Sequence, residues 1–203
     1  MTQVTIDRSG QRVGSIIIES AVTRRALLGG LATLTAMAAA PAFASSPALL
    51  TGAGDIRNLS LVNNRTGESL NTIYWAEGDY IPEALEAVNH ILRDWREDLA
   101  FEMDPHAIDI LSATQRLLDS GEPFQVISGY RTRKTNAMLR RRSRAVAKNS
   151  YHIKGMAVDI AMQTRSVRQI SRAGLSLGAG GVGRYSRSHF VHLDSGPVRK
   201  WGR

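Results

Sequence analysis

Three residues of this chain, His152, Asp159 and His192, could together bind a metal ion. They lie among turn residues and strand-like apolar residues between Ser128 and Asp194. Two imidazoles and one carboxylate suit a catalytic zinc, because a tetrahedral ion then keeps one open position for water. Any one of these histidines alone would more often be structural, so the hypothesis depends on all three. Another divalent ion could use the same ligands.

The spacing of the first two residues excludes a single helical face. His152 and Asp159 are seven residues apart with Gly155 between them, unlike the His-Glu-x-x-His pattern in which a helix presents two ligands. The pattern favours a loop that leads into a buried strand over residues 156–161, with the carboxylate pointing back toward the imidazole.

A final strand is predicted over residues 190–194. Side chains alternate along a strand, so His192 and Asp194 should share one face. Asp194 could then lie near the metal, or it could orient His192 through a hydrogen bond.

The remaining elements must place these residues. Apolar periodicity and turn residues predict a hairpin, four helices and one more strand. Leu117 and Leu118 are expected to face inward at the end of the second helix. The glycine-rich run 178–183 lacks the Lys-Ser/Thr of a phosphate-binding loop, so a nucleotide site is not expected. The elements are strands over 58–62, 70–75 and 124–127, helices from Pro82 and Asp104-Pro105, a short helix capped by Thr132, and a helix from Thr164 to about Ala173.

Composition sets further limits. The 203 residues include no cysteine, which excludes disulfides, cysteine-rich zinc sites and a cysteine nucleophile. The net charge of +8 suggests an anionic partner, although a solubilising surface is an equal alternative. The densest basic cluster, residues 140–144, has no interleaved aromatic side chain, so nucleic-acid binding is not expected. A solvated loop over the active site that could touch an anionic substrate is the favoured interpretation.

The first 44 residues are interpreted as an export signal. Arg24 and Arg25 precede an apolar stretch that ends at a small-residue cleavage pattern before Ser45, which favours a twin-arginine signal. An ordinary secretory signal or an uncleaved anchor are the alternatives. The sequence therefore predicts a signal over 1–44, a flexible lead-in over 45–55, a domain over 56–203, a periplasmic or cell-envelope location, and no membrane span after cleavage.

Three motifs carry a family resemblance: Ser128-Gly129-Tyr130-Arg131-Thr132, then Ser150-x-His152-x-x-Gly155-x-Ala157-x-Asp159, then Phe190-Val191-His192. Together they resemble the zinc D-Ala-D-Ala peptidase superfamily, which includes D-alanyl-D-alanine carboxypeptidases and dipeptidases and is related to lysostaphin-type enzymes and the hedgehog domain. The small bacterial murein-peptidase branch is the most similar. The resemblance implies an α+β fold in which a short antiparallel sheet carries the zinc and helices pack on one side.

The resemblance also implies roles for individual residues. His152, Asp159 and His192 match the zinc ligands, Arg131 matches the arginine that steadies the developing oxyanion, and Ser150 matches a serine beside the first ligand. One zinc ion would polarise the scissile carbonyl and activate water.

The general base is where the chain departs from the better-known members. They place Glu or Asp three residues before the last ligand, where this chain has His189. An imidazole can act as a base near neutral pH, so His189 is the first candidate and Asp194 the second.

Two functions of different classes follow. The first is zinc-dependent hydrolysis of peptidoglycan peptide bonds by a monomeric endopeptidase or D,D-carboxypeptidase in cell-wall remodelling. The alternative is a catalytically silent zinc-binding module that attaches to peptidoglycan or to an envelope partner, as expected if neither base candidate reaches the metal-activated water.

Overall fold

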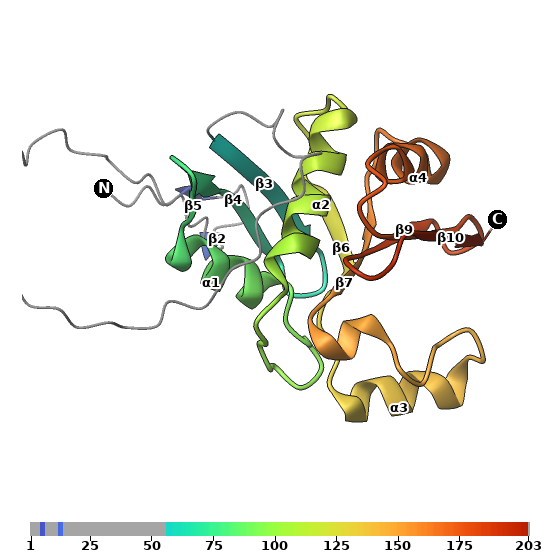
Figure 1. The fold of residues 1–203 in the computed structure, drawn as a ribbon. Helices are drawn as coiled ribbons and strands as arrows, with labels where there is room; N and C mark the ends of the chain where they lie inside the picture. Colours follow the sequence, from blue (N-terminus) through green and yellow to red (C-terminus); the bar gives the residue numbers. More distant parts are fainter. Residues whose placement is uncertain (1–4, 7–11, 14–55, 203) are drawn as a thin grey trace, which may run out of the picture.

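The main sheet of the protein contains eight strands in the order β10-β8-β9-β7-β6-β3-β4-β5 (Figure 1). The computed structural model describes residues 5–6, 12–13 and 56–202. The strands of the main sheet are β3 (Ile56–Asn63), β4 (Glu68–Ala76), β5 (Asp79–Tyr80), β6 (Phe124–Ser128), β7 (Ala157–Ala161), β8 (Gly181–Tyr185), β9 (Phe190–Asp194) and β10 (Arg199–Gly202).

The sheet is mixed, so the prediction of an antiparallel sheet is correct only in part. Strands β6, β7, β9 and β8 pair antiparallel in that order. At the two ends, however, β3 runs parallel to β6 and β10 runs parallel to β8. The long connection from β3 to β6, which includes two helices, supplies the crossover that parallel strands require. The overall class is α+β, as predicted.

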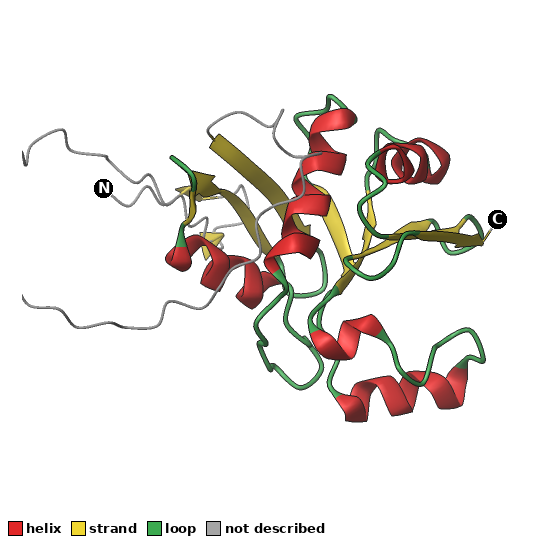
Figure 2. Cartoon of the chain, viewed as in Figure 1, coloured by secondary structure: helices red, strands yellow, loops and turns green. Residues whose placement is uncertain are grey.

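Within the described residues, four α-helices and one short 3₁₀ helix accompany the sheet (Figure 2). The predicted starts at Pro82 and Pro105 are confirmed, and Asp104 caps the second helix by accepting a bond from the amide of His106 at 3.0 Å. Thr132 caps the third in the same way. The helices are α1 (Pro82–Ile91), α2 (Pro105–Leu117), α3 (Arg133–Arg142), η2 (Tyr151–Lys154) and α4 (Val167–Ser176).

Two local predictions were wrong. The last helix begins after Ser166 rather than Thr164, because Ser166 and Gln169 form a reciprocal capping box. Leu117 is 51% exposed, whereas Leu118 is buried. Leu117, the last residue of α2, lies on the side of the helix that faces away from the core. Leu118, the residue that caps the helix, packs inward.

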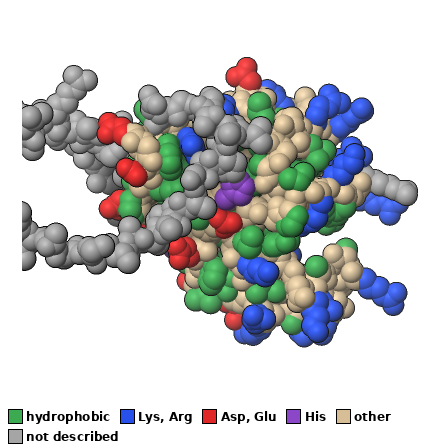
Figure 3. All heavy atoms as spheres, in the orientation of Figure 1, with side chains coloured by type: hydrophobic (Ala, Val, Ile, Leu, Met, Phe, Trp, Pro, Cys, Tyr) green, Lys and Arg blue, Asp and Glu red, His purple; other side chains and the backbone are tan. Residues whose placement is uncertain are grey.

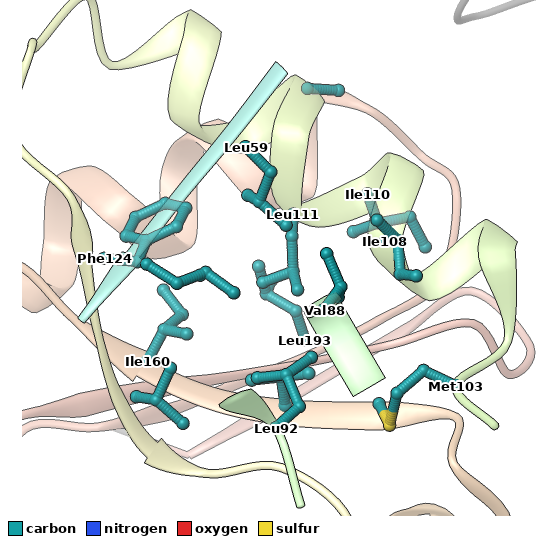
Figure 4. Packing of buried hydrophobic residues seen from close by; sticks show 14 of the residues in the cluster. Leu59, Val88, Leu92, Met103, Ile108, Ile110, Leu111, Phe124, Ile160 and Leu193 are labelled. Carbon is teal, nitrogen blue, oxygen red and sulfur yellow. The ribbon is translucent and has the colours of Figure 1, made fainter. Parts of the chain in front are cut away.

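The hydrophobic core lies between one face of the sheet and helices α1, α2 and α4 (Figure 4). Val158 and Ile160 of β7 point into this core, as do Val191 and Leu193 of β9. Since side chains alternate along a strand, the residues between them, Asp159 and His192, lie on the opposite face. The core therefore anchors the two strands that present the predicted ligands.

The predicted signal over 1–44 and lead-in over 45–55 lie outside the described residues, apart from β1 (Thr5–Ile6) and β2 (Arg12–Val13), which pair antiparallel. Among the described residues, no helix is long and apolar enough to cross a membrane.

Candidate metal centre

The site is built on one row of residues across neighbouring strands. Ser128 of β6 pairs with Asp159 of β7, which pairs with His192 of β9. His192 then pairs with Gly183 of β8, and Gly183 with Trp201 of β10. Directly opposed residues on one face of a sheet have neighbouring side chains. Two predicted ligands therefore meet across a single strand pairing, although they are 33 residues apart in sequence.

The third predicted ligand reaches this row from η2. Ser150 caps η2 and accepts a bond from the amide of His152 at 3.4 Å. Gly155 ends the element in a left-handed conformation, with φ of 70°, which glycine adopts without strain. A Cβ there would lie 2.5 Å from the carbonyl oxygen of Glu102. The motif Ser150-x-His152-x-x-Gly155 is thus a capped turn, as the predicted loop before a strand requires.

The three ligand groups converge closely. Nδ1 of His192 lies 2.8 Å from Oδ1 of Asp159, and Nε2 of His152 lies 3.2 Å from Nδ1 of His192 and 3.3 Å from Oδ1 of Asp159. Ligands around one tetrahedral zinc are separated by about 3.3 Å, given zinc–ligand bonds of about 2 Å. All three residues are buried. The separations fit one small cation.

The outer nitrogens of both imidazoles are already occupied. Nδ1 of His152 lies 2.7 Å from the carbonyl oxygen of Gly129, an acceptor, so this nitrogen carries a proton and Nε2 offers its lone pair to the cluster. Nε2 of His192 lies 2.9 Å from Oδ2 of Asp194, which leaves Nδ1 for the cluster. Metal-binding histidines are commonly held in this way by a carbonyl or carboxylate. The donor set therefore fits a metal.

The electrostatics of the cluster favour a bound positive charge. Burial works to raise the pKa of Asp159, but His152 and His192 outweigh it and hold that pKa well below its usual range. Burial lowers the pKa of His152, which keeps this ring neutral. Burial also works to lower the pKa of His192, but its hydrogen bonds to Asp159 and Asp194 raise it to about 8. A proton or a divalent cation at Nδ1 of His192 would each balance the negative charge of the neighbouring carboxylates.

Arg131 is bonded to the cluster from the β6 side. Its Nη2 donates to Oδ2 of Asp159, and its Nε donates to Oγ of Ser128 at 2.7 Å. Its backbone amide donates to the carbonyl oxygen of His152 at 3.1 Å. The structure thus brings Arg131 beside the predicted ligands, and it shows contacts to two of them that the sequence did not predict.

Asp194 lies behind His192 and is itself held by Arg199. The guanidinium of Arg199 contacts both carboxylate oxygens, at 2.9 and 2.7 Å. Burial works to raise the pKa of Asp194, but its bonds to His192 and Arg199 lower it to about 2. Asp194 is fully buried, and this geometry favours orienting His192 over accepting a proton from water.

Two glycines of β8 allow the C-terminal strand to reach the site. A Cβ on Gly181 would collide with the guanidinium of Arg199, and a Cβ on Gly183 would lie 2.5 Å from the ring of Trp201. The Trp201 ring lies 5.2 Å from that of His192. The tail 198–201 was expected to pack behind the last strand, but the sequence predicted no role for Arg199 or Trp201 in the site. The alternating glycines of the run 178–183, considered only as a phosphate loop, were the available signal.

His189 lies in the turn that joins β8 to β9. It is exposed and has a φ of 55°, a left-handed conformation that histidine adopts more readily than most residues. Within the described part of the chain it forms no hydrogen bond or ion pair. The structure thus leaves the predicted base free to meet a substrate, without joining it to the cluster.

Comparison with known proteins agrees with this arrangement. Residues 51–201 match the model of the M15 peptidase family described as peptidoglycan L,D-endopeptidase MepK. The chain belongs to this family. The peptidoglycan L,D-endopeptidase MepK of Escherichia coli K12 is 45% identical over 176 residues, which cover 86% of this chain and 93% of that protein. The "Probable peptidoglycan L,D-endopeptidase MepK" of Haemophilus influenzae is 40% identical over 146 residues, or 71% of this chain and 78% of that protein.

Membership in the MepK family confirms the predicted resemblance and the predicted class of enzyme, a peptidase that acts on peptidoglycan. The matched residues include the three ligand candidates, Arg131, His189 and the C-terminal strand.

Proposed function

We propose that this chain is a zinc-dependent L,D-endopeptidase that cuts peptide bonds between an L-configured and a D-configured centre in peptidoglycan. The convergence of His152 Nε2, His192 Nδ1 and Asp159 Oδ1 on one buried point carries the proposal. The activity in the names of the family relatives, which cover most of this chain, supports the choice of bond. It narrows the expectation of an endopeptidase or D,D-carboxypeptidase to the first.

The three residues would hold one zinc ion, which supplies Lewis acidity toward a peptide carbonyl and acidifies water. The chain's own residues then set the geometry. Gly129 and Asp194 hold the two imidazoles in the tautomers that direct a lone pair into the cluster. The antiparallel pairing of β7 with β9 keeps Asp159 against His192. The close-packed hydrophobic core beneath β7 and β9 resists movement. The ligands on these strands would therefore keep their positions before a substrate binds.

Arg131 would act on the substrate as well as on Asp159. Its side chain is 12% exposed, so it is not wholly enclosed where it lies beside the cluster. Its fixed positive charge would stabilise the negative charge that develops on the carbonyl oxygen during attack by water.

His189 would accept the proton of the attacking water and return it to the leaving amine. It occupies the position three residues before His192 where related enzymes have a carboxylate, and it is exposed in the turn that leads into β9, the strand that carries His192. A neutral imidazole there is a suitable base near pH 7.

The wider setting is proposed on the same grounds. The chain would adopt the hedgehog and D-Ala-D-Ala-peptidase type of fold, be exported through the signal over residues 1–44, and act in the periplasm or cell envelope. All three ligands come from one chain, so the site would be complete in a monomer.

Digestion of purified peptidoglycan, with added zinc or with chelator, tests the function. The expected result is chelator-sensitive release of fragments whose masses identify an L,D bond. Fragments from a D,D bond would contradict the proposed specificity. A folded, zinc-loaded sample that releases nothing at several pH values would favour the silent zinc-binding module.

Ligand variants test the metal centre independently of turnover. His152→Ala and His192→Ala should each lose zinc, measured by metal analysis of the purified protein, and should lose activity. His90→Ala is the matched control, because His90 is 62% exposed and pairs with Glu68 away from the cluster. Full zinc occupancy in either ligand variant would contradict the assignment.

A further inference from the structure

One segment carries most of the net charge of the chain. Residues 132–149, here called the basic arm, contain seven basic residues and no acidic one, against a net charge of +8 for the whole sequence. The remainder of residues 56–202 contains 14 basic and 15 acidic residues. The excess of positive charge therefore lies in the arm, whose helix α3 is at the lower edge of the molecule (Figure 1). Lys and Arg side chains are visible at that edge in Figure 3, and others, which acidic residues elsewhere in the sequence balance, lie at the upper right.

The arm begins and ends at the metal centre. It follows Arg131 directly, and it leads through Ser150 into η2, which carries His152. The amide of Arg131 donates to the carbonyl oxygen of His152, so the two ends of the excursion are held together at the site. The base of the arm therefore lies beside the ligand cluster.

Buried polar contacts hold the base of the arm in place. The carboxylate of Asp94, 2% exposed, accepts a bond from the amide of Thr132 at 2.9 Å. Asn136 donates to the carbonyl oxygen of Ala147 at 3.1 Å, which ties the loop after α3 back to the helix. Thr135 and Asn136 are the buried residues of α3. The arm is thus anchored through polar groups, while the rest of it remains outside the core.

The distal cations have no partner among the described residues. Arg140, Arg141, Arg142 and Arg144 are exposed and form no hydrogen bond or ion pair within the part of the chain that the structure describes. Basic residues in the last turn of a helix favour its dipole, which would explain some of Arg140–Arg142. Arg144 and Lys148 lie beyond the helix, so this explanation does not cover them.

The composition of the arm favours one kind of anion. Residues 132–149 contain no Phe, Tyr or Trp, so the arm has neither the stacking platform of a single-strand nucleic-acid binder nor the aromatic wedge of a membrane-inserting helix. The guanidinium group forms two parallel hydrogen bonds with a carboxylate. Peptidoglycan, the material on which the family acts, carries free carboxylates on its stem peptides.

From the position and the chemistry of the arm, we propose that residues 132–149 bind the free carboxylates of peptidoglycan stem peptides next to the bond being cut, and so hold the polymer on the enzyme. This inference rests on the proposed function for the identity of the polymer. It adds a binding surface outside the metal centre, with Arg140, Arg141, Arg142 and Arg144 as its main contacts.

The test measures binding apart from hydrolysis. The full chain is sedimented with purified peptidoglycan in the presence of chelator, over a series of salt concentrations. The triple variant Arg140→Gln, Arg141→Gln, Arg142→Gln keeps good helix-forming residues. It should bind about tenfold more weakly at low salt, and its binding should depend less on salt, because exposed ion pairs are each weak and are screened.

The matched control removes the same charge elsewhere. Arg168→Gln, Arg172→Gln, Lys200→Gln changes three exposed cations outside the arm, and it should bind within about threefold of the unchanged protein. Peptidoglycan whose carboxylates have been converted to amides should abolish the difference between the two triple variants. Should the arm variant misfold by circular dichroism, Arg144→Gln with Lys148→Gln, outside the helix, replaces it.

Cleavage of a small, soluble cross-linked muropeptide separates the two proposals. If neither the unchanged protein nor the arm variant cuts it, but the arm variant binds peptidoglycan less tightly than the unchanged protein, the proposed hydrolysis is contradicted and the proposed role of the arm is supported. If both cut it and both sediment equally with peptidoglycan, the arm proposal is overturned. Binding of the unchanged protein to vesicles containing phosphatidylglycerol, without binding to peptidoglycan, would also overturn it.

Discussion

The Nε2 atom of His192 lies 2.9 Å from Oδ2 of Asp194, and the same carboxylate lies 2.7 Å from Nη2 of Arg199. A proposed metal ligand is therefore held by a carboxylate that is itself held by an arginine from the last strand. Gly181 makes this series of contacts possible, because any Cβ at that position would occupy the space of the Arg199 guanidinium.

Replacing Arg199 should weaken zinc binding without removing a ligand. Arg199→Gln leaves Asp194 with one fewer partner, so His192 is less firmly oriented, and zinc affinity should fall about tenfold, at the low end for such supporting residues. Affinity is measured by competition with a chelator. Arg199→Lys should lose less zinc affinity than Arg199→Gln, because the ammonium group keeps the positive charge beside Asp194. It should not match the unchanged protein, because an ammonium cannot contact both carboxylate oxygens in one plane.

Lys200→Gln is the matched control for Arg199. It removes the same charge from the next residue of β10, which is exposed, and it should leave zinc affinity unchanged. A zinc affinity of Arg199→Gln within twofold of the unchanged protein would show that Asp194 orients His192 without help.

Replacing Arg131 should lower turnover more than it lowers zinc binding. Arg131→Gln removes the charge proposed to stabilise the oxyanion, and kcat should fall by about 10²–10³-fold, as for loss of one such donor. Ser128→Ala removes the bond that positions Nε of Arg131 but keeps the guanidinium, so its effect should be smaller. Kinetics of Arg131→Gln equal to those of the unchanged enzyme would remove Arg131 from the mechanism.

The role of His189 can be separated from its backbone conformation. Asparagine adopts a left-handed φ as readily as histidine, so His189→Asn keeps the β8–β9 turn and removes the imidazole. If His189 is the base, turnover should fall by about 10²–10⁴-fold at unchanged zinc occupancy. A fall of less than threefold would assign the proton transfer to another group.

The contact between Glu68 and Arg93 should make part of the stability depend on pH. Glu68 accepts a hydrogen bond from Arg93 at 2.7 Å, and this bond lowers the pKa of Glu68 from 4.5 to about 2, against the opposing effect of burial. The pKa is lower in the folded state, so the contribution is complete above pH 4.5 and is lost as the pH falls toward 2.

Urea unfolding of the unchanged protein and of Glu68→Gln, at pH values between 7 and 2.5, tests this linkage. The difference in free energy of unfolding should be largest above pH 4.5 and shrink below it. It should not exceed about 1 kcal/mol, because the carboxylate is partly exposed and screened by solvent. A difference that stays constant down to pH 2.5 would exclude the proposed linkage.

Local sequence determined most of the elements and the identity of the ligand candidates. Proline and aspartate mark the starts of α1 and α2, and alternating apolar residues mark β7 and β9, because capping and side-chain alternation act within a few residues. The spacing of His152, Gly155 and Asp159 likewise predicted a turn that leads into a strand, since glycine tolerates the left-handed conformation there. The family resemblance followed from the same motifs.

The tertiary structure decided which distant residues support that site. Strand order and register are set by packing over the whole sheet, and they place Trp201 and Arg199 two strands away from His192 and Asp194, across the gaps left by Gly183 and Gly181. The glycines of β8 indicate only that some bulky group comes close. They do not identify Arg199 and Trp201, because β10 reaches the side chains of β9 only after β8 has paired between the two strands. The same packing anchored the basic arm at both ends beside the ligands, a position that its charge alone could not reveal.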